Sequence, residues 1–566
     1  MLIGIDMGGT HIDGVAISKN KIVKSVKHVV DHTDLYQTIL HALNDLISDL
    51  DQKDISRINL STTISTNSIV EQKISEVDLI LQKGPGINYE FPEIDSNLKY
   101  IDGYVDHRGK MVKDLNKNEL EEIKSKLKSG ANKNLAVVTK FSTRNPEHEQ
   151  ALAEYFADNY YQITQGHTLS GRLNFPRRVN TAYLNSAVYN TFQKFALNIE
   201  KALAEKEITA PIYILKADGG TMHLKDAVET PVETILSGPA ASFMGISALF
   251  DNQADSVLLD IGGTTTDIFF LVDGLPVFEP AGISIDQHKT LVRAIYSVSI
   301  GLGGDSKLSV SDSGSTDDPA DLIRKINIGP EREGAPLVFG GPEPTLTDAM
   351  IILGQLEQYS LTEEQIEKSE IGIGQLAEKL KLSKAEFSEL ALNRAAQIIK
   401  EKVDQLLEII NSQPVYTVRE VLADRQIKPI EIKVIGGPAE VFSSYLEQAF
   451  DIEVKYPNRY EIANAIGAAL AQPTLELNLL ADTQRKILII PELNIYQKIG
   501  SRYSLSEGRT FILDQLNQAA KQLSESELET EIVEESSFNM VDGFKSGKNI
   551  RIKAQIKPGL STEIEH

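Results

Sequence analysis

LIGIDMGGTHIDGVAIS, residues 2–18, contains two short β segments, LIGID and IDGVAIS, around a glycine-rich turn. This pattern predicts a hairpin with a tight connection that exposes its backbone. A second copy occurs at residues 257–272, where VLLDI and DIFFLV flank another glycine-rich turn. Asp-x-Gly-Gly-Thr therefore begins at both Asp6 and Asp260. Two similar hairpins in one chain favour two related lobes that face each other.

Each motif places a carboxylate, a backbone free of Cβ atoms and a hydroxyl within a few residues. A triphosphate with Mg²⁺ requires these groups. We expect Asp6 and Asp260 to hold the hydrated metal. The backbone N–H groups and hydroxyls that follow would then surround the phosphates from two sides; they belong to Gly8, Gly9, Thr10, Gly262, Gly263, Thr264 and Thr265. A simple hairpin turn explains either motif alone, but duplication makes accident a poor explanation.

A third glycine-rich segment occurs late in the chain. In IKVIGGPAEVF, residues 432–442, a strand pattern runs into a helix pattern through Gly436 and Gly437. A turn without side chains would let the flat face of adenosine approach the backbone. The alternative is a close strand-to-helix turn that simply needs glycine.

Strand and helix patterns alternate along the chain, which favours an α/β layered fold. Apolar spacing predicts a helix at 191–206, a buried strand at 211–215 and a long amphipathic helix at 385–411. Residues 309–344 are rich in Gly, Pro, Asp and Ser, which indicates a long loop. Towards the C-terminus, residues 512–536 have a helical and then acidic pattern, and 549–556 alternate like a β-strand.

The composition excludes several kinds of protein. Lys and Arg total 57 against 80 for Asp and Glu, a formal net charge of -23, which disfavours binding to nucleic acid or to anionic membranes. The lack of cysteine excludes disulfides, thiolate nucleophiles and Cys-ligated metal centres. There is no signal-peptide pattern and no run of about 18 apolar residues. We therefore expect a cytoplasmic protein, and its length of 566 residues predicts two or three domains.

Two hairpins followed by a late Gly-Gly turn resemble the phosphate 1, phosphate 2 and adenosine motifs of the sugar kinase, actin and heat-shock ATPase superfamily. Within it, the chain resembles the hydantoinase A and 5-oxoprolinase family. The matching segments are STTISTNSIVEQK (61–73), DGYVDHRG (102–109), FSTRNPEHE (141–149), ADGGT (217–221), PVETILSGPAAS (231–242), LLDIGGTTTDIFFLVDG (258–274), SIGLGGDS (299–306), PEPTLTDAMIILG (342–354) and NAIGAA (464–469).

This resemblance implies a two-lobed ribonuclease H-like ATPase fold with a central nucleotide cleft and a small C-terminal module. The expected ranges are 1–175 for the N-terminal lobe, 176–475 for the hydantoinase A-like lobe and 476–566 for the module. ATP and Mg²⁺ are the implied cofactors, and Gly303 and Gly304 would join the nucleotide site. The implied chemistry is phosphorylation of the amide or carbonyl oxygen of a small cyclic amide or ketone, completed by a hydantoinase B-like partner subunit.

Candidate substrate residues lie in several of these motifs: Asn67, Asp218, Gly219, Ser237 and Gly238. Asn67 is equally well explained as a turn or cap residue. Asp13, Asp267 and Asp348 are candidate cleft carboxylates, the first two with a catalytic role alongside Asp6 and Asp260.

A polar cluster, Arg144, Asn145, Glu147 and His148, resembles a family motif and makes His148 a metal candidate. A helix start capped by Asn145 explains the cluster slightly better.

The chain departs from the family pattern at His11 and Ile12, where Phe-Thr is usual, and at GAPLVFGG, residues 334–341, where Pro-Gly-Pro is expected. Three functions fit the motifs. The first is an ATP-dependent hydrolase subunit for hydantoin, 5-oxoproline or a related lactam, and the second is a ketone carboxylase subunit. The third is a non-catalytic, nucleotide-gated binding or assembly protein. A homo-oligomer is compatible with each.

Overall fold

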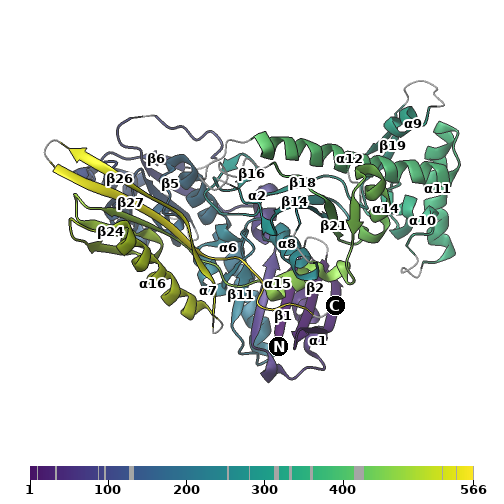
Figure 1. Cartoon of the computed structure of the whole chain (residues 1–566), viewed down its shortest axis with the longest axis horizontal. Coiled ribbons are helices and arrows are strands. Elements are labelled where there is room, and N and C mark those ends of the chain that lie inside the picture. The colour runs from purple at the N-terminus through teal and green to yellow at the C-terminus, as the bar shows by residue number, and fades with distance from the viewer. Residues whose placement is uncertain are drawn as a thin grey trace. The chain divides into compact units, whose positions relative to one another are not determined.

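The computed structural model describes residues 1–8, 11–31, 35–86, 88–94, 97–126, 133–250, 254–279, 281–311, 318–330, 334–356, 361–412, 426–524, 527–542 and 545–564. The chain forms two compact units, each assembled from segments distant in sequence (Figure 1). Unit 1 contains Met1–Ala241, Phe278–Ala294 and Ala468–Glu563, and unit 2 is built mainly of Ser242–Val277 and Ile295–Gly467.

The first sheet of unit 1 has six strands in the order β12-β11-β4-β1-β2-β3. β1, β4 and β11 run parallel, whereas β2, β3 and β12 are antiparallel to their neighbours. The strands are β1 (Leu2–Met7), β2 (His11–Ser18), β3 (Lys21–Val29), β4 (Arg57–Thr62), β11 (Ile212–Leu215) and β12 (Thr221–His223). The predicted N-terminal hairpin and the predicted strand at 211–215 are confirmed.

Helix α1 (Leu35–Ile47) packs against this sheet and against α6 (Phe175–Glu205), whose last part enters the core of the sheet. The helix predicted at 191–206 is the last part of α6, where Phe192, Phe195 and Ile199 follow helical spacing and enter the core. The sheet takes strands from both sides of the expected boundary at 175, because β11 pairs with β4. The expected ranges 1–175, 176–475 and 476–566 stay predictions.

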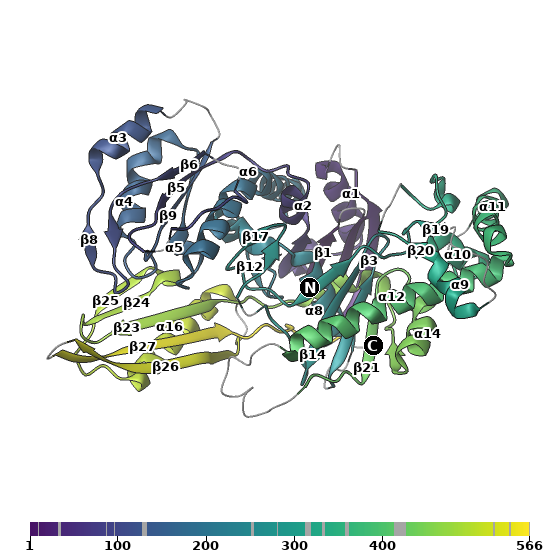
Figure 2. The same cartoon turned by 90° about the horizontal axis from the view of Figure 1, so that it is seen from above.

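The second sheet of unit 1 has four strands in the order β10-β9-β5-β6, all parallel. The strands are β5 (Val77–Gln82), β6 (Asn97–Tyr100), β9 (Asn134–Thr139) and β10 (Gln162–Gln165) (Figure 2). The helices of this part of the chain are α2 (Ile64–Val70), α3 (Lys117–Lys126), α4 (Glu147–Phe156) and α5 (Gly166–Leu169). A separate two-stranded sheet is formed by β7 (Tyr104–Val105) and β8 (Met111–Lys113). β5 and β9 are buried along their whole length, as expected for parallel strands covered on both faces. Parallel strands end at one edge, so the loops after β5, β9 and β10 gather there.

The C-terminal sheet of unit 1 has the order β25-β24-β23-β27-β26. Its strands are β23 (Glu476–Asp482), β24 (Ile487–Ile490), β25 (Ile495–Lys498), β26 (Thr530–Asp542) and β27 (Lys545–Ile556). Helix α16 (Leu505–Leu523) packs on one face and begins at a Ser504–Glu507 capping box. The strand predicted at 549–556 is confirmed. Of the stretch 512–536, only the part up to Leu523 is helix, and its acidic end enters β26.

Unit 2 repeats the arrangement of the first sheet. β13 (Ser256–Ile261) pairs antiparallel with β14 (Thr266–Val272) and parallel with β21 (Glu431–Ile435), as β1 pairs with β2 and β4. The order is β15-β14-β13-β21-β22, and β18 also pairs with β14. The remaining strands are β15 (Leu275–Pro276), β18 (Ser297–Ile300) and β22 (Glu453–Lys455). The predicted second hairpin and the predicted repeat are confirmed.

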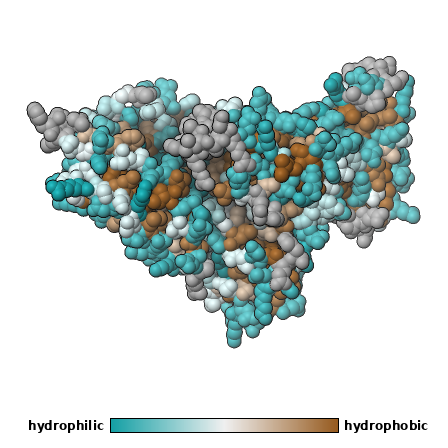
Figure 3. All heavy atoms as spheres, in the orientation of Figure 1, coloured by the Kyte–Doolittle hydropathy of each residue, from teal (hydrophilic) through white to brown (hydrophobic). Residues whose placement is uncertain are grey.

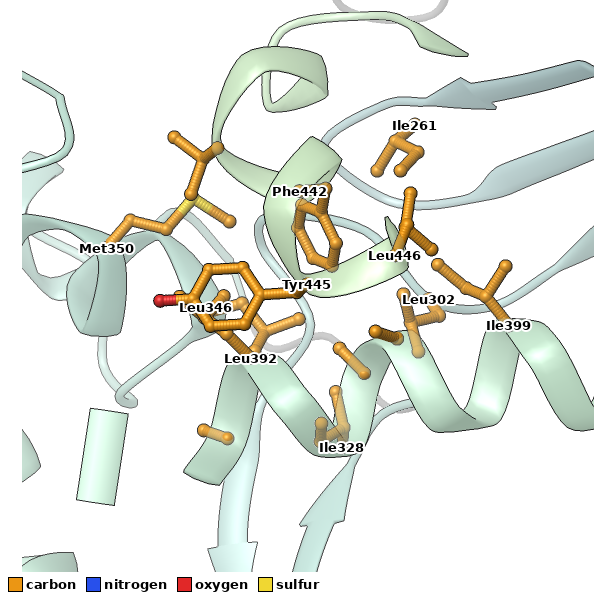
Figure 4. Packing of buried hydrophobic residues seen from close by; sticks show 14 of the residues in the cluster. Ile261, Leu302, Ile328, Leu346, Met350, Leu392, Ile399, Phe442, Tyr445 and Leu446 are labelled. Atoms are coloured by element: carbon orange, nitrogen blue, oxygen red, sulfur yellow. The ribbon is translucent and has the colours of Figure 1, made fainter. Parts of the chain in front are cut away.

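Helices α12 (Lys384–Ser412) and α14 (Ala439–Phe450) cover the sheet of unit 2. Phe442 and Leu446 of α14 pack with Leu392 and Ile399 of α12 in one core (Figure 4). This confirms the helix predicted at 385–411. The other α-helices in the described residues are α7 (Leu224–Glu229), α8 (Ser237–Leu249), α9 (Pro319–Lys325), α10 (Leu346–Ile352), α11 (Glu363–Leu380) and α15 (Ala463–Leu470). Two short strands, β16 (Ser284–Ile285) and β17 (His288–Lys289), pair with each other.

The segment 309–344 is not one long loop where the structure describes it. β19 (Leu308–Val310) pairs with β20 (Ile326–Ile328), and α9 precedes β20. The loop prediction was wrong there because Leu308, Ile326 and Ile328 are buried in the core of unit 2. These three buried apolar side chains stabilise an antiparallel strand pair that the Gly- and Pro-rich composition does not reveal.

The face in Figure 3 is largely hydrophilic, and its hydrophobic residues form separate patches. In the part of the chain that the structure describes, no helix is both long and apolar enough to cross a bilayer.

Candidate active site

The first hairpin places Asp6 directly opposite Asp13, one residue pair before the strands end. Asp6 is 8% exposed. Beyond Met7, the N–H of Gly8 donates to the carbonyl of His11 at 3.0 Å, which closes the turn. Gly9 and Thr10, both predicted to bind phosphate, lie outside the described residues.

The second hairpin has the same geometry. Asp260 lies opposite Asp267, and the N–H of Gly262 donates to the carbonyl of Thr265 at 2.9 Å. Residues Gly263–Thr265 at the tip are exposed. The duplicated motif therefore produces two turns of matching register, and residues Gly263–Thr265 of the second turn are exposed.

Asp260 is held by two side chains of unit 2. Its Oδ2 accepts a hydrogen bond from Ser242 Oγ at 2.6 Å and another from Asn464 Nδ2 at 3.4 Å. Burial raises the pKa of the facing Asp267 to about 7, the charge of Asp260 adds to this effect, and a hydrogen bond from Ser299 opposes it. Asp267 therefore takes up a proton near neutral pH.

Asp13, the counterpart of Asp267, has a different environment. Lys27 Nζ donates to both of its oxygens, at 2.7 and 2.8 Å. Burial raises the pKa of Asp13, and the attraction of Lys27 opposes this shift. The pKa of nearby His11 is lowered by burial and by Lys27. The two hairpins thus share backbone geometry but differ in electrostatics.

The loop after β18 supports the second phosphate turn. The N–H of Gly304 donates to the carbonyl of Gly262 at 3.0 Å, and the N–H of Asp305 donates to that of Gly263 at 2.6 Å. A Cβ atom on Gly303 would lie 2.6 Å from Gly262 O. Close backbone packing therefore requires glycine at this position, and direct phosphate contact by Gly303 and Gly304 stays a prediction.

The Gly-Gly turn after β21 meets the same turn. Gly436 has φ +95°, and a Cβ atom there would lie 2.2 Å from Ile261 O. Gly437 faces open space, with nothing within 4 Å of a Cβ atom, and Pro438 Cγ would lie 3.5 Å from a Cβ on Gly304. Unit 2 therefore brings together three glycine-rich segments that are far apart in sequence.

In unit 1, three predicted substrate residues surround the end of β4. Asn67 Nδ2 donates to Thr63 Oγ1 at 3.2 Å, and Ser237 Oγ donates to the carbonyl of Thr62 at 2.7 Å. A Cβ atom on Gly238 would lie 3.2 Å from Thr63 Cγ2. Asn67 lies within α2, after the N-cap Thr63, so the interpretation of Asn67 as a cap is wrong.

This group lies next to the first hairpin, because the N–H of Thr63 donates to the carbonyl of Met7 at 3.3 Å. β4 and β1 are neighbouring parallel strands, and their register aligns Asp6 with Ser61. The end of a parallel strand is a common place for ligand-binding loops. Unit 1 thus joins Asn67, Ser237 and Gly238 to the first Asp-x-Gly-Gly-Thr turn.

Asp218 and Gly219 belong to a different side-chain group. Asp218 is 4% exposed and accepts hydrogen bonds from Thr474 Oγ1, at 3.2 and 3.0 Å, and from the N–H of Gly220 at 3.0 Å. Burial would raise its pKa, but Lys216, Arg293 and these hydrogen bonds lower it overall. Gly219 has φ +83°, so the pair forms a tight turn fixed to Thr474. A substrate role for Asp218 and Gly219 stays a prediction.

The cluster after β9 starts a helix. Asn145 Oδ1 accepts the N–H of Glu147 at 3.0 Å, immediately before α4. His148 is 1% exposed, and its Nδ1 lies 2.9 Å from Gln82 Oε1. Among the described residues, no group of three His, Asp or Glu side chains is arranged to hold a metal. The predicted helix start is confirmed, but its N-cap residue is Pro146 rather than the expected Asn145.

Asp348 has a structural role rather than that of a cleft carboxylate. It is fully buried and accepts the N–H groups of Leu337, Val338 and Thr345 at 3.1, 3.0 and 2.9 Å. Ser369 Oγ donates to it at 2.6 Å. Its oxygens therefore hold two segments of unit 2 together.

Ser242 and Asn464 were not predicted. Both lie in quoted motifs, at the end of PVETILSGPAAS and the start of NAIGAA. They are 18 and 204 residues from Asp260 in sequence. In the sequence, the only sign of a role for Ser242 and Asn464 is that each is a polar residue beside small ones.

Comparisons with known proteins give the family. Residues 178–477 match the profile described as Hydantoinase/oxoprolinase, and residues 2–159 match the profile described as Hydantoinase/oxoprolinase N-terminal region. The first match alone spans more than half of the chain. This chain belongs to the hydantoinase/oxoprolinase family. The resemblance read from the motifs is confirmed.

Three relatives of this hydantoinase/oxoprolinase family member show which kinds of protein it is similar to. An uncharacterized protein of Methanocaldococcus jannaschii is 24% identical over 83% of this chain and 72% of the relative. Acetophenone carboxylase gamma subunit of Aromatoleum aromaticum is 25% identical over 62% of this chain and 49% of the relative. Caprolactamase subunit alpha of Pseudomonas jessenii is 22% identical over 92% of this chain and 75% of the relative.

Two solved structures share the fold. Nucleotide-free acetone carboxylase aligns with a TM-score of 0.64 and 15% identity, covering 98% of this chain and 87% of the other. The ATP-dependent caprolactamase from Pseudomonas jessenii aligns with a TM-score of 0.66 and 17% identity, covering 98% and 86%. The predicted α/β fold class is confirmed.

Proposed function

We propose that this hydantoinase/oxoprolinase family member is the ATP-dependent subunit of a hydrolase that opens a small cyclic amide, such as hydantoin, 5-oxoproline or a related lactam. The observation that carries the proposal is the duplicated hairpin, with Asp6 opposite Asp13 and Asp260 opposite Asp267. The family supports a reaction on a cyclic amide, because one relative is named as a caprolactamase subunit.

Unit 2 fits a nucleotide. Gly263–Thr265 are exposed beside Asp260, so their N–H and hydroxyl groups can donate to phosphate oxygens. Gly437 faces open space where a flat base can approach. Asp260 would hold Mg²⁺, which neutralises phosphate charge when bound. Asp6, at the corresponding position of the first hairpin, is proposed for the same role.

In the proposed chemistry, phosphorylation turns the amide oxygen from a poor leaving group into a good one. The γ-phosphoryl group leaves ADP and bonds to the amide oxygen, so the ring carbon becomes electrophilic. Water then adds to that carbon, the C–N bond breaks and the nitrogen takes a proton, which leaves an acyl phosphate. A second water hydrolyses the acyl phosphate to a carboxylate and inorganic phosphate. Asn67, Ser237 and Gly238, grouped around Thr63 next to the first hairpin, are the residues that we expect to position the lactam. A closed site brings the reactants together and excludes other water.

We further propose that hydrolysis is completed with a hydantoinase B-like partner. Two relatives are themselves named as subunits, of acetophenone carboxylase and of caprolactamase, which supports an assembly of more than one chain. The relative named as a carboxylase subunit also supports a second candidate function. In that reaction a ketone oxygen would accept the phosphoryl group, and a carboxyl group would be added instead of water.

A steady-state ATPase assay separates these candidates. The purified chain is measured alone and with a B-like subunit, in the presence of 5-oxoproline, hydantoin, caprolactam or acetophenone, each with and without bicarbonate. Stimulation by a lactam without bicarbonate supports the hydrolase. Stimulation by the ketone only with bicarbonate supports the carboxylase. ATP binding without stimulation by any of these compounds, even with the partner subunit, favours the nucleotide-gated binding protein.

A further inference from the structure

Four arginines from four parts of the sequence converge in unit 1. Arg108 lies in DGYVDHRG, Arg144 in FSTRNPEHE, Arg485 in the turn between β23 and β24, and Arg551 on β27. Figure 2 shows β24 and β25 beside β8 and α5, where the loops of the parallel sheet end. Neither motif has a part in the proposed ATP chemistry, although both belong to the family pattern.

Arg108, Arg144 and Arg485 meet at the turn of residues 106–110. Arg551 lies on β27, where its Nε donates to Asn549 Oδ1 at 3.1 Å, and Asn549 pairs with Asp482. Arg485 donates from Nη1 to the carbonyl of Arg108 and from Nη2 to the carbonyl of Gly109, the latter at 3.1 Å. Arg144 donates from Nη1 to the carbonyl of His107. Burial lowers the pKa of Arg144 to about 10, and the nearby charges of Arg551 and Arg485 act in the same direction.

Two carboxylates lie among the arginines, and other groups already engage them. Asp106 Oδ1 accepts the N–H groups of Arg108 and Lys110 at 2.8 and 2.9 Å. Asp482 accepts the N–H of Arg485 at 2.9 Å and Arg108 Nη2 at 3.3 Å. Four cations therefore share a small volume with two anions, in a chain whose formal net charge is -23. The local field has the opposite sign from the molecule as a whole.

The cluster has a buried donor and an open side. Arg144 is 9% exposed, and its Nε is buried without a hydrogen-bond partner in the described part of the chain. Such a donor is costly unless an acceptor meets it. The side chain of Arg108 is 26% exposed, and Arg551 is exposed. A small anion can thus reach the cluster from solvent.

The close packing around Gly109 requires glycine at this position. The residue has φ +82°, and a Cβ atom there would lie 2.7 Å from Arg485 Nη1 and 2.8 Å from Arg144 O. Only glycine fits between the two arginines in this turn. The turn of residues 106–110 therefore fixes the spacing of the guanidinium groups.

We propose that Arg108, Arg144, Arg485 and Arg551 form a binding site for a small oxyanion, with a carboxylate or phosphate group as its ligand. Guanidinium groups present paired, planar donors that match both anions. This site goes beyond the proposed ATP chemistry. A free phosphate and a carboxylate of a substrate or product are the two sources of such a group.

The test is calorimetric titration of the full chain, without ATP or lactam, with inorganic phosphate and with acetate at constant ionic strength. Arg551→Gln is the main variant, because an exposed side chain can change without loss of the fold. We expect it to weaken binding of the preferred anion by about tenfold or more. Arg509→Gln removes an arginine paired with Glu535 on the same C-terminal module and should bind as the wild type does.

Stronger binding of phosphate identifies a phosphate site, and stronger binding of acetate identifies a carboxylate site. Arg551→Lys should recover only part of the affinity, because lysine keeps the charge but loses the planar pair of donors. The proposal is overturned if wild type binds neither anion saturably, or if Arg551→Gln binds as tightly as Arg509→Gln. Phosphate held at the glycine turns would be unaffected by Arg551→Gln. The result is independent of whether lactams stimulate ATP turnover.

Discussion

Gly436 lies so close to Asp260 that a Cβ atom on Gly436 would stand 2.7 Å from Asp260 Oδ1. The contact arises because β13 and β21 are parallel neighbours that align Asp260 with Ile435, the residue before Gly436. The proposed adenosine turn and the proposed metal carboxylate therefore form one packed structure. A side chain at Gly436 must displace one of them.

We predict that Gly436→Ala both destabilises the protein and impairs nucleotide binding. The positive φ and the two short contacts should cost about 1–3 kcal/mol in the free energy of unfolding, measured by urea denaturation. Displacement of Asp260 should also weaken Mg·ATP binding, measured by titration. Wild-type values in both experiments would contradict the packing described for this turn.

Gly437 is the matched control, because nothing lies within 4 Å of a Cβ atom there. Gly437→Ala should change the free energy of unfolding by less than about 0.5 kcal/mol. Gly437→Val should leave stability similar but reduce affinity for ATP, since its side chain would occupy the space proposed for the base. Unchanged ATP affinity in Gly437→Val would place the base elsewhere.

Asp260→Asn should reduce ATP turnover by about 100-fold or more, because the amide has no charge for a metal. Asparagine has the same size as aspartate, and its carbonyl oxygen can still accept the hydrogen bond from Ser242. The midpoint of thermal unfolding should therefore stay close to that of wild type. Glu447→Gln, an exposed carboxylate change on α14, is the control and should retain full turnover. Normal turnover in Asp260→Asn would remove Asp260 from the proposed site.

The sequence predicted features that are local. Asp-x-Gly-Gly-Thr and its flanking apolar residues lie within a few positions, so both hairpins and the repeat could be predicted. The partners of Asp260 could not, because Asn464 reaches it only after the chain has folded. The prediction for Asp348 was wrong for the same reason. Its carboxylate accepts hydrogen bonds from Leu337 and Ser369, which come close to it only in the folded chain. A carboxylate alone gives no sign of whether it faces a cleft or backbone donors.

The structural role of Asp348 gives a clear prediction. Asp348→Ala would leave several buried donors unsatisfied and should lower the free energy of unfolding by about 3–5 kcal/mol, measured by chemical denaturation. Glu364→Ala, on the exposed first turn of α11, should cost less than about 0.5 kcal/mol. Loss of ATP turnover at unchanged stability in Asp348→Ala would instead restore a role in the cleft.

Glu431 predicts a pH-dependent part of the stability of unit 2. Its carboxylate accepts hydrogen bonds from Ser256 at 2.9 Å, from Lys433 at 2.8 Å and from Lys455 at 2.9 Å. Lys433 has a side chain that is only 1% exposed, so this carboxylate offsets part of the cost of burying its charge. Burial would raise the pKa of Glu431, but hydrogen bonds from Lys433, Lys455 and Ser256 lower it to about 2.

The folded pKa of Glu431 therefore lies below its ordinary value of 4.5. Ionised Glu431 should contribute its full stability above pH 4.5, and that contribution should be lost as pH falls towards about 2. Glu431→Gln should cost about 2–3 kcal/mol at pH 7, and urea denaturation at pH 7, 4 and 3 should show the gap to wild type narrowing. Removing the exposed partner with Lys455→Met should cost less, because Lys433 and Ser256 still bond to the carboxylate. A gap for Glu431→Gln that stays constant down to pH 3 would mean that packing, rather than charge, accounts for the loss.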